Sequence, residues 1–196
     1  GISASNYVTI VSGPCSPDRP PAFIGQLSEN GTSASWAVSF GEPLAGAGAG
    51  QSLCWALRRE SAGIEAGSMM LAGPSGGVVS HCVLGTACVV SLDGYGLSSG
   101  NSLVIQLGEA PCGNSTAVAL WDGGLTQVTV NGSEPFDQYE VGVPTGGQPS
   151  RHYKLCWGHL PSSIESHTVE AGQLIMSGPL PAELVCTLGQ HCALTL

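Results

Sequence analysis

The chain has 196 residues, enough for one large domain or for two domains of about 100 residues each. Charged residues make up 10% of it and the formal net charge is −9, which excludes the basic face that a nucleic-acid-binding protein needs. Because 42% of the residues are hydrophobic and no apolar run approaches the roughly 18 residues that cross a bilayer, we expect a folded chain without a membrane span.

Eight cysteines are distributed along the chain, and their even number favours disulfide bonds formed outside the cytosol. A zinc site is the competing interpretation, but zinc sites usually contain Cys-x2-Cys pairs, and the closest cysteines here have five residues between them. We therefore predict a secreted protein with no metal and no cofactor, whose disulfides involve Cys15, Cys54, Cys82, Cys88, Cys112, Cys156, Cys186 and Cys192.

The first predicted element is a strand within residues 1–16, followed by a cysteine. Val8 and Ile10 alternate with polar neighbours, a period of two that is typical of a strand with one buried face. We interpret this segment as a spare copy of a strand that belongs at the end of a repeat. Its residues Gly1, Ser3, Asn6, Val8, Ile10 and Cys15 return as Gly96, Ser98, Asn101, Leu103, Ile105 and Cys112.

Residues 17–113 are predicted to form a first Ig-like β-sandwich. Apolar runs recur there between turns rich in Gly and Pro, at the spacing of about 8 to 12 residues that is typical of sandwiches. Cys54 and Cys112 would bridge the two sheets while Cys82 and Cys88 close a hairpin, but the sequence permits three pairings among these four cysteines.

Residues 114–196 are predicted to form a second Ig-like sandwich, because motifs of the first return after about 102 residues. Leu53-Cys54-Trp55 returns as Leu155-Cys156-Trp157, and both tryptophans are expected in a core near a disulfide. Four residues follow Cys192, so the second copy is expected to lack its last strand and fourth cysteine. The other shared motifs are Gly67, Met69-Met70-Leu71, Gly73-Pro74, Cys82 and Cys88 in the first copy and Gly172, Leu174-Ile175-Met176, Gly178-Pro179, Cys186 and Cys192 in the second.

The expected fold is therefore all-β, with two tandem sandwich repeats and the second completed by an N-terminal donor strand. Tyr7, Val8 and Ile10 would fill the open edge of a neighbouring unit, where Cys15 would meet an unpaired cysteine. Donor and acceptor are different surfaces, so such contacts join copies of the chain head-to-tail into a ring or a filament. Two alternatives stay open: the strand folds back onto its own second domain, or the repeats continue covalently in one long chain.

Three of the five asparagines lie in Asn-x-Ser/Thr sequons, the acceptors of N-linked glycans. These are Asn30, Asn114 and Asn131. Asn-Gly at the first and third sequon is also typical of a hairpin turn, and the two interpretations are compatible because a glycan needs an exposed turn. We predict a glycoprotein with covalent glycans at these positions.

The candidate enzymatic motifs in this sequence lack the context or the spacing that each motif requires. The Gly-Leu-Ser-Ser-Gly string at residues 96–100 matches a nucleophile elbow, but an alternating strand pattern follows it where that motif needs a helix. The histidines lack the His-x-x-x-His spacing of a zinc-binding helix, and the acids beside Asp93 and Asp122 are too few for a calcium loop. The chain is therefore not expected to be an enzyme.

Together, the Leu-Cys-Trp, Gly-Pro and Cys-x5-Cys motifs resemble a cysteine and tryptophan repeat of large secreted and surface proteins of protists such as apicomplexans and dinoflagellates. The architecture is also similar to that of subunits of extracellular protist filaments such as flagellar hairs. The resemblance implies structural work outside the cell and offers no catalytic residues.

We therefore predict a structural subunit of an extracellular, glycosylated filament, located at the cell surface or in an appendage, whose partners are copies of itself. The alternative is a secreted adhesion or carbohydrate-binding module in which Trp36 or Trp121 stacks on sugar rings. These two tryptophans do not align between the two copies, which favours a local role for them.

Overall fold

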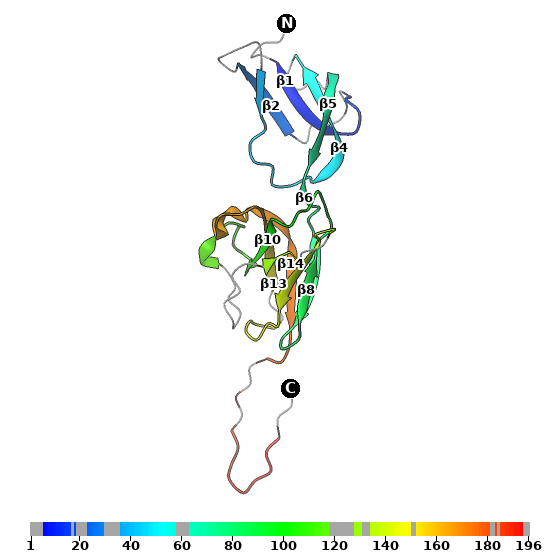
Figure 1. The fold of residues 1–196 in the computed structure, drawn as a ribbon. Helices are drawn as coiled ribbons and strands as arrows, with labels where there is room; N and C mark the ends of the chain where they lie inside the picture. Colours follow the sequence, from blue (N-terminus) through cyan, green and yellow to red (C-terminus); the bar gives the residue numbers. More distant parts are fainter. Residues whose placement is uncertain are drawn as a thin grey trace. The chain divides into compact units, whose positions relative to one another are not determined.

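The computed structural model describes residues 6–16, 18, 23–29, 36–57, 63–117, 128–130, 134–149, 152–180, 183 and 185–193. Nearly all of its regular structure is strand, so the prediction of an all-β fold is confirmed. Two compact units are present, the first formed by Gly1–Ser75 and Gly94–Gly96 and the second by Gly76–Asp93 and Leu97–Leu196 (Figure 1). Across these described ranges, no helix has the length and apolar character needed to cross a bilayer.

The first unit contains one antiparallel sheet and one short strand pair. The sheet strands are β1 (Tyr7–Ser12), β2 (Phe23–Glu29), β3 (Trp36–Ser39), β4 (Gly48–Ala56) and β5 (Ile64–Leu71), and the pair is β6 (Gly73–Pro74) and β9 (Gly94–Tyr95). In the sheet they lie in the order β3-β2-β1-β4-β5, so β3 and β5 are the two edges.

Strand β1 lies at the centre of this sheet, which differs from the donor role expected for residues 1–16. It pairs with β2 on one side and with β4 on the other, so neither of its edges is free for a neighbouring unit. Tyr7 and Val8 are half-buried in its own unit, and Ile10 is 1% exposed. The proposed assembly strand, with Cys15 after it, is therefore an integral part of the first unit.

The second unit has a five-stranded sheet in the order β11-β10-β13-β14-β7 and a two-stranded sheet of β12 and β8. Strand β7 runs parallel to β14, and the other pairs are antiparallel. Two 3-10 turns, η1 (Ser115–Ala117) and η2 (Ile164–Ser166), accompany them. The strands are β7 (Val78–Val83), β8 (Cys88–Ser91), β10 (Asn101–Leu107), β11 (Val128–Thr129), β12 (Gln138–Gly142), β13 (His152–His159) and β14 (Val169–Ser177).

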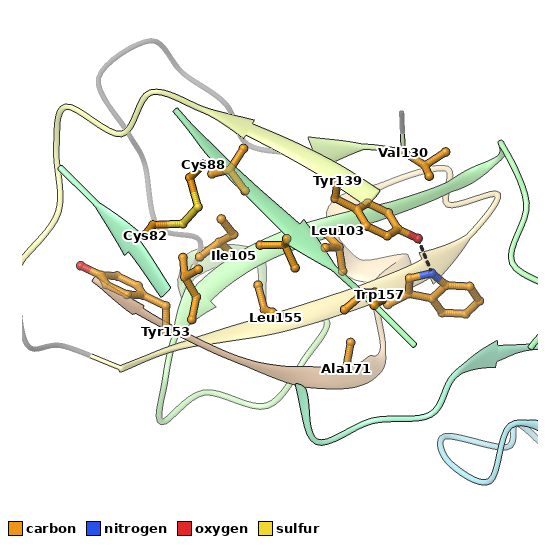
Figure 2. Close-up of a cluster of buried hydrophobic side chains, with 14 of the residues drawn as sticks. Cys82, Cys88, Leu103, Ile105, Val130, Tyr139, Tyr153, Leu155, Trp157 and Ala171 are labelled. Atoms are coloured by element: carbon orange, nitrogen blue, oxygen red, sulfur yellow. Dashed lines mark hydrogen bonds between the residues drawn. A yellow bond between two sulfur atoms is a disulfide. The ribbon is translucent and has the colours of Figure 1, made fainter. Parts of the chain in front are cut away.

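Side chains from both of these sheets form the core of the second unit (Figure 2). Leu103 on β10 and Leu155 on β13 are 0% exposed. Trp157 is 5% exposed and its Nε1 donates a hydrogen bond to the hydroxyl of Tyr139 at 3.2 Å, which confirms that this tryptophan is a core residue. Trp55, its counterpart in the first unit, is only half-buried.

The Trp157–Tyr139 hydrogen bond gives a first prediction. Tyr139→Phe keeps the ring but removes the acceptor, leaving a buried indole N–H without this partner, so we expect the free energy of unfolding to fall by about 1 to 2 kcal/mol. Denaturant unfolding of Tyr139→Phe, Trp157→Phe and the double variant measures the coupling. Additive losses would show that the hydrogen bond contributes nothing.

Candidate assembly site

Two of the four disulfide bonds occupy equivalent places in the two repeats. Cys15–Cys54, with a Cα–Cα distance of 5.7 Å, ties the segment after β1 to β4. Cys112–Cys156, at 5.4 Å, ties the segment after β10 to β13 in the same way. The expected Cys54–Cys112 bridge is wrong, because β1 lies beside β4 and brings Cys15 to Cys54. The expected Cys82–Cys88 pair is present.

The two units share a strand order when their motifs are aligned. In the first unit β1, β4 and β5 are consecutive, and in the second their counterparts β10, β13 and β14 are consecutive. Strand β3 corresponds to β12, since each leads into a Gly-x-Pro turn, at Gly41 to Pro43 and at Gly142 to Pro144. The two edges of the first sheet, β5 and β3, therefore correspond to β14 and β12.

Strands β7 and β8 and the turn between them, here called the closing hairpin (residues 78–91), connect β14 to β12 in the second unit. The two strands lie in different sheets and are joined to each other by the Cys82–Cys88 disulfide. Strand β7 pairs with β14, with Cys82 opposite Met176, and β8 pairs with β12, with Val90 opposite Tyr139. Cys82 is 2% exposed and Val90 is 0% exposed. The closing hairpin thus supplies both hydrogen-bonded edges and core side chains to the second unit.

Gly172 lies where the closing hairpin approaches β14 most tightly. A Cβ built on Gly172 would overlap the carbonyl oxygen of Val78 and lie 2.7 Å from its nitrogen. Its counterpart in β5 is Gly67, with φ of 158° against 156°, but a Cβ there meets only Leu53 Cδ1, at 3.9 Å, among the described residues. Among the residues that the structure describes, none takes beside Gly67 the space that Val78 of the closing hairpin takes beside Gly172.

The apolar side chains of β5 are correspondingly uncovered. Ile64 is 71% exposed and Met70 is 59% exposed. Three apolar residues of β14 are 0% exposed, and their counterparts in β5 are exposed or half-buried, in the pairs Ala171 and Ala66, Leu174 and Met69, and Met176 and Leu71. We call β5 the open edge of the first unit.

A second hairpin (residues 185–193) contains the Cys186–Cys192 disulfide and is exposed along its length. Val185 is 93% exposed and Leu188 is 101% exposed, although both are apolar. Among the described strands, none pairs with this segment, which lies near the C terminus marked in Figure 1. The second hairpin therefore repeats the motif of the closing hairpin without its packing.

The predicted glycosylation and sugar-binding residues are only partly visible. Asn114 is half-buried, and its Oδ1 accepts hydrogen bonds from the backbone N–H and the hydroxyl of Thr116 at 3.0 and 2.7 Å. Asn30, Asn131 and Trp121 lie outside the described residues. Trp36 begins β3.

Ser102 and His167 form a buried polar pair that the sequence did not suggest. Their side chains are 2.8 Å apart, and they are 2% and 0% exposed. His167 Nδ1 lies 3.1 Å from the carbonyl oxygens of Ser163 and Ile164, which can only accept, so Nδ1 carries the proton and Nε2 accepts from Ser102. Because both side chains are buried, a substrate cannot reach them. The pair connects β10 to the residue that follows η2.

The pH dependence of stability follows from His167. Burial lowers the pKa of its imidazole, while hydrogen bonds to the Ile164 and Ser163 carbonyls oppose that shift. The unfolded chain then binds a proton more readily, so stability is complete above about pH 6.5 and falls as the pH decreases below it. We expect His167→Gln to remove that part of the pH slope in denaturant unfolding at pH 5 to 8. An unchanged slope would contradict the assignment.

The residues that distinguish the open edge from its covered counterpart, above all Gly67 and Leu188, were not predicted from the sequence as site residues. The sequence contained a signal for these residues, since Gly67 repeats as Gly172 and the two Cys-x5-Cys motifs align.

The described residues contain no cluster of three or more His, Cys, Asp or Glu that could hold a metal ion. Comparison with known protein families, curated proteins and solved structures finds no match.

Proposed function

We propose that the protein is a structural subunit of an extracellular, N-glycosylated filament built from Ig-like sandwich repeats. The observation that carries the proposal is the combination of an open edge in the first unit with an exposed second hairpin, because the second unit is completed by a hairpin of the same kind. Such a molecule has two unlike and complementary surfaces, which suits head-to-tail growth, either between separate chains or along one long repeat chain.

The chemistry of the chain supports an extracellular setting for this role. All cysteines are paired in the structure, and disulfides of this density persist in oxidising compartments. Glycans on Asn30, Asn114 and Asn131 would cover the surface of a chain in which only 10% of the residues carry charge. Glycans and disulfides together would keep an exposed fibre soluble and resistant to unfolding.

Electron microscopy of the full chain, secreted from cells that add N-glycans, tests the proposal. Straight fibres with a regular axial repeat are the expected result. Compact single particles at all concentrations would contradict it, and binding of such particles to a glycan array would favour the adhesion alternative. Mass spectrometry before and after enzymatic deglycosylation measures how many of the three sequons are occupied.

A further inference from the structure

We propose that the second hairpin of one copy docks beside the open edge of the first unit of another copy, as the closing hairpin docks beside β14. The inference deepens the proposed function, on which it rests, by naming the donor, the acceptor and their register. It also reverses the direction expected from the sequence, since the N-terminal unit accepts and the second hairpin donates.

The turn of the donor already has the conformation of the turn in the closing hairpin. In the closing hairpin, Thr86 N–H donates to the carbonyl of Val83 at 3.1 Å, and in the second hairpin Gln190 N–H donates to the carbonyl of Thr187 at the same distance. The glycine of each turn has nearly the same backbone, with φ of 79° at Gly85 and 78° at Gly189. A preorganised hairpin loses little conformational freedom on docking.

The acceptor presents what the donor needs. Strand β5 pairs with β4, and no other described strand pairs with it, so β5 is an edge of the sheet, and an edge strand favours an added strand. Its half-buried Met69 and Leu71 correspond to Leu174 and Met176, which are 0% exposed in the core of the second unit. Among the described residues, none takes beside Gly67 the place that Val78 takes beside Gly172, which leaves room for the backbone of an added strand.

The expected register of the docked hairpin follows from the pairing of β7 with β14 in the second unit. Cys82 lies opposite Met176 and His81 lies opposite Ile175 in the parallel pairing of β7 with β14. Applied to the counterparts, Cys186 lies opposite Leu71 and Val185 lies opposite Met70. Leu84, the counterpart of Leu188, packs against the core, and its N–H donates to the carbonyl of Ser177 at 2.9 Å. Leu188 is thus the anchor of the docked hairpin.

Two matched variants of the donor test the docking. Leu188→Asp places a charge at the anchor, and we expect it to weaken assembly at least about 30-fold, as for a central interface residue. Val185→Asp adds the same charge to the same hairpin. The counterpart of Val185 in the closing hairpin is His81, which is exposed although that hairpin is packed against β14, so we expect Val185→Asp to retain assembly. Neither variant is expected to disturb folding, because both side chains are exposed in the single chain.

The acceptor is tested by Gly67→Ala, whose Cβ would obstruct the incoming backbone. Light scattering of full chains across a concentration series is expected to find Leu188→Asp and Gly67→Ala each monomeric. Mixing the two variants restores one competent donor and one competent acceptor, so a 1:1 complex that grows no further is expected. Thermal unfolding of each variant alone shows whether it has folded.

The possible failures are distinguishable. Assembly of Leu188→Asp to the wild-type extent overturns the docking and leaves the filament proposal standing. Equal loss in Val185→Asp overturns the register, and two folded variants that form no 1:1 complex overturn the pairing of these surfaces. A wild-type chain that stays monomeric at every concentration overturns both the docking and the proposed function.

Discussion

Replacing Gly172 by alanine is expected to lower the free energy of unfolding of the second unit by about 3 kcal/mol, the upper part of the range for overpacking a core. The added Cβ overlaps backbone atoms of Val78, which cannot rotate away as a side chain would. The closing hairpin must then shift or leave, which would uncover Val90 and Leu92, now 0% and 1% exposed. Calorimetry and hydrogen exchange of residues 78–91 measure the two effects.

Gly67→Ala is the matched control for this substitution. The two glycines have φ of 158° and 156°, so any cost of the backbone conformation is common to both variants. At a concentration where the chain is monomeric, Gly67→Ala is expected to cost at least about 2 kcal/mol less than Gly172→Ala, because no hairpin lies beside it. Equal losses would mean that backbone strain, and not the closing hairpin, makes glycine necessary in these strands.

Removing the Cys112–Cys156 disulfide is expected to cost about 4 kcal/mol, since this bond joins residues with a sequence separation of 44. The double variant Cys112→Ser with Cys156→Ser measures this without leaving a free thiol. The expected result is a large drop in the unfolding temperature of the second unit under non-reducing conditions.

The double variant Cys186→Ser with Cys192→Ser is the control, because it also removes one disulfide but from an exposed hairpin. We expect it to leave the unfolding of the second unit unchanged in the monomeric chain. A comparable loss of stability would show that the second hairpin packs on the unit that precedes it.

Much of the fold could be predicted from local sequence. The alternation at Val8 and Ile10, and at Leu103 and Ile105, marked the central strands β1 and β10 correctly as strands. Proximity in sequence also identified the Cys82–Cys88 pair, since a loop of this length brings its own ends together.

The positions at which each folded unit begins and ends within the repeat could not be predicted from local sequence. A periodic sequence shows how long the unit is, but the boundary of a folded module depends on which strands share hydrogen bonds. Strand β7 pairs in parallel with β14, which follows it by many residues, and no local pattern encodes that contact. We placed the boundary of the folded unit at the wrong point of the sequence repeat. This error led to the assignment of β1 to another unit and to the expected pairing of Cys54 with Cys112.

The interleaved course of the chain has a consequence for resistance to proteolysis. The chain passes from the first unit to the second after Ser75, returns after Asp93 and passes over again after Gly96. A cleavage after Asp93 or Gly96 separates two covalent fragments, because no disulfide spans these positions, but the closing hairpin stays attached to the first fragment and remains paired with β14 and β12 of the second. A single cut at these positions would therefore leave the two fragments held by strand pairing, whereas a cut in a simple linker between two domains would separate them.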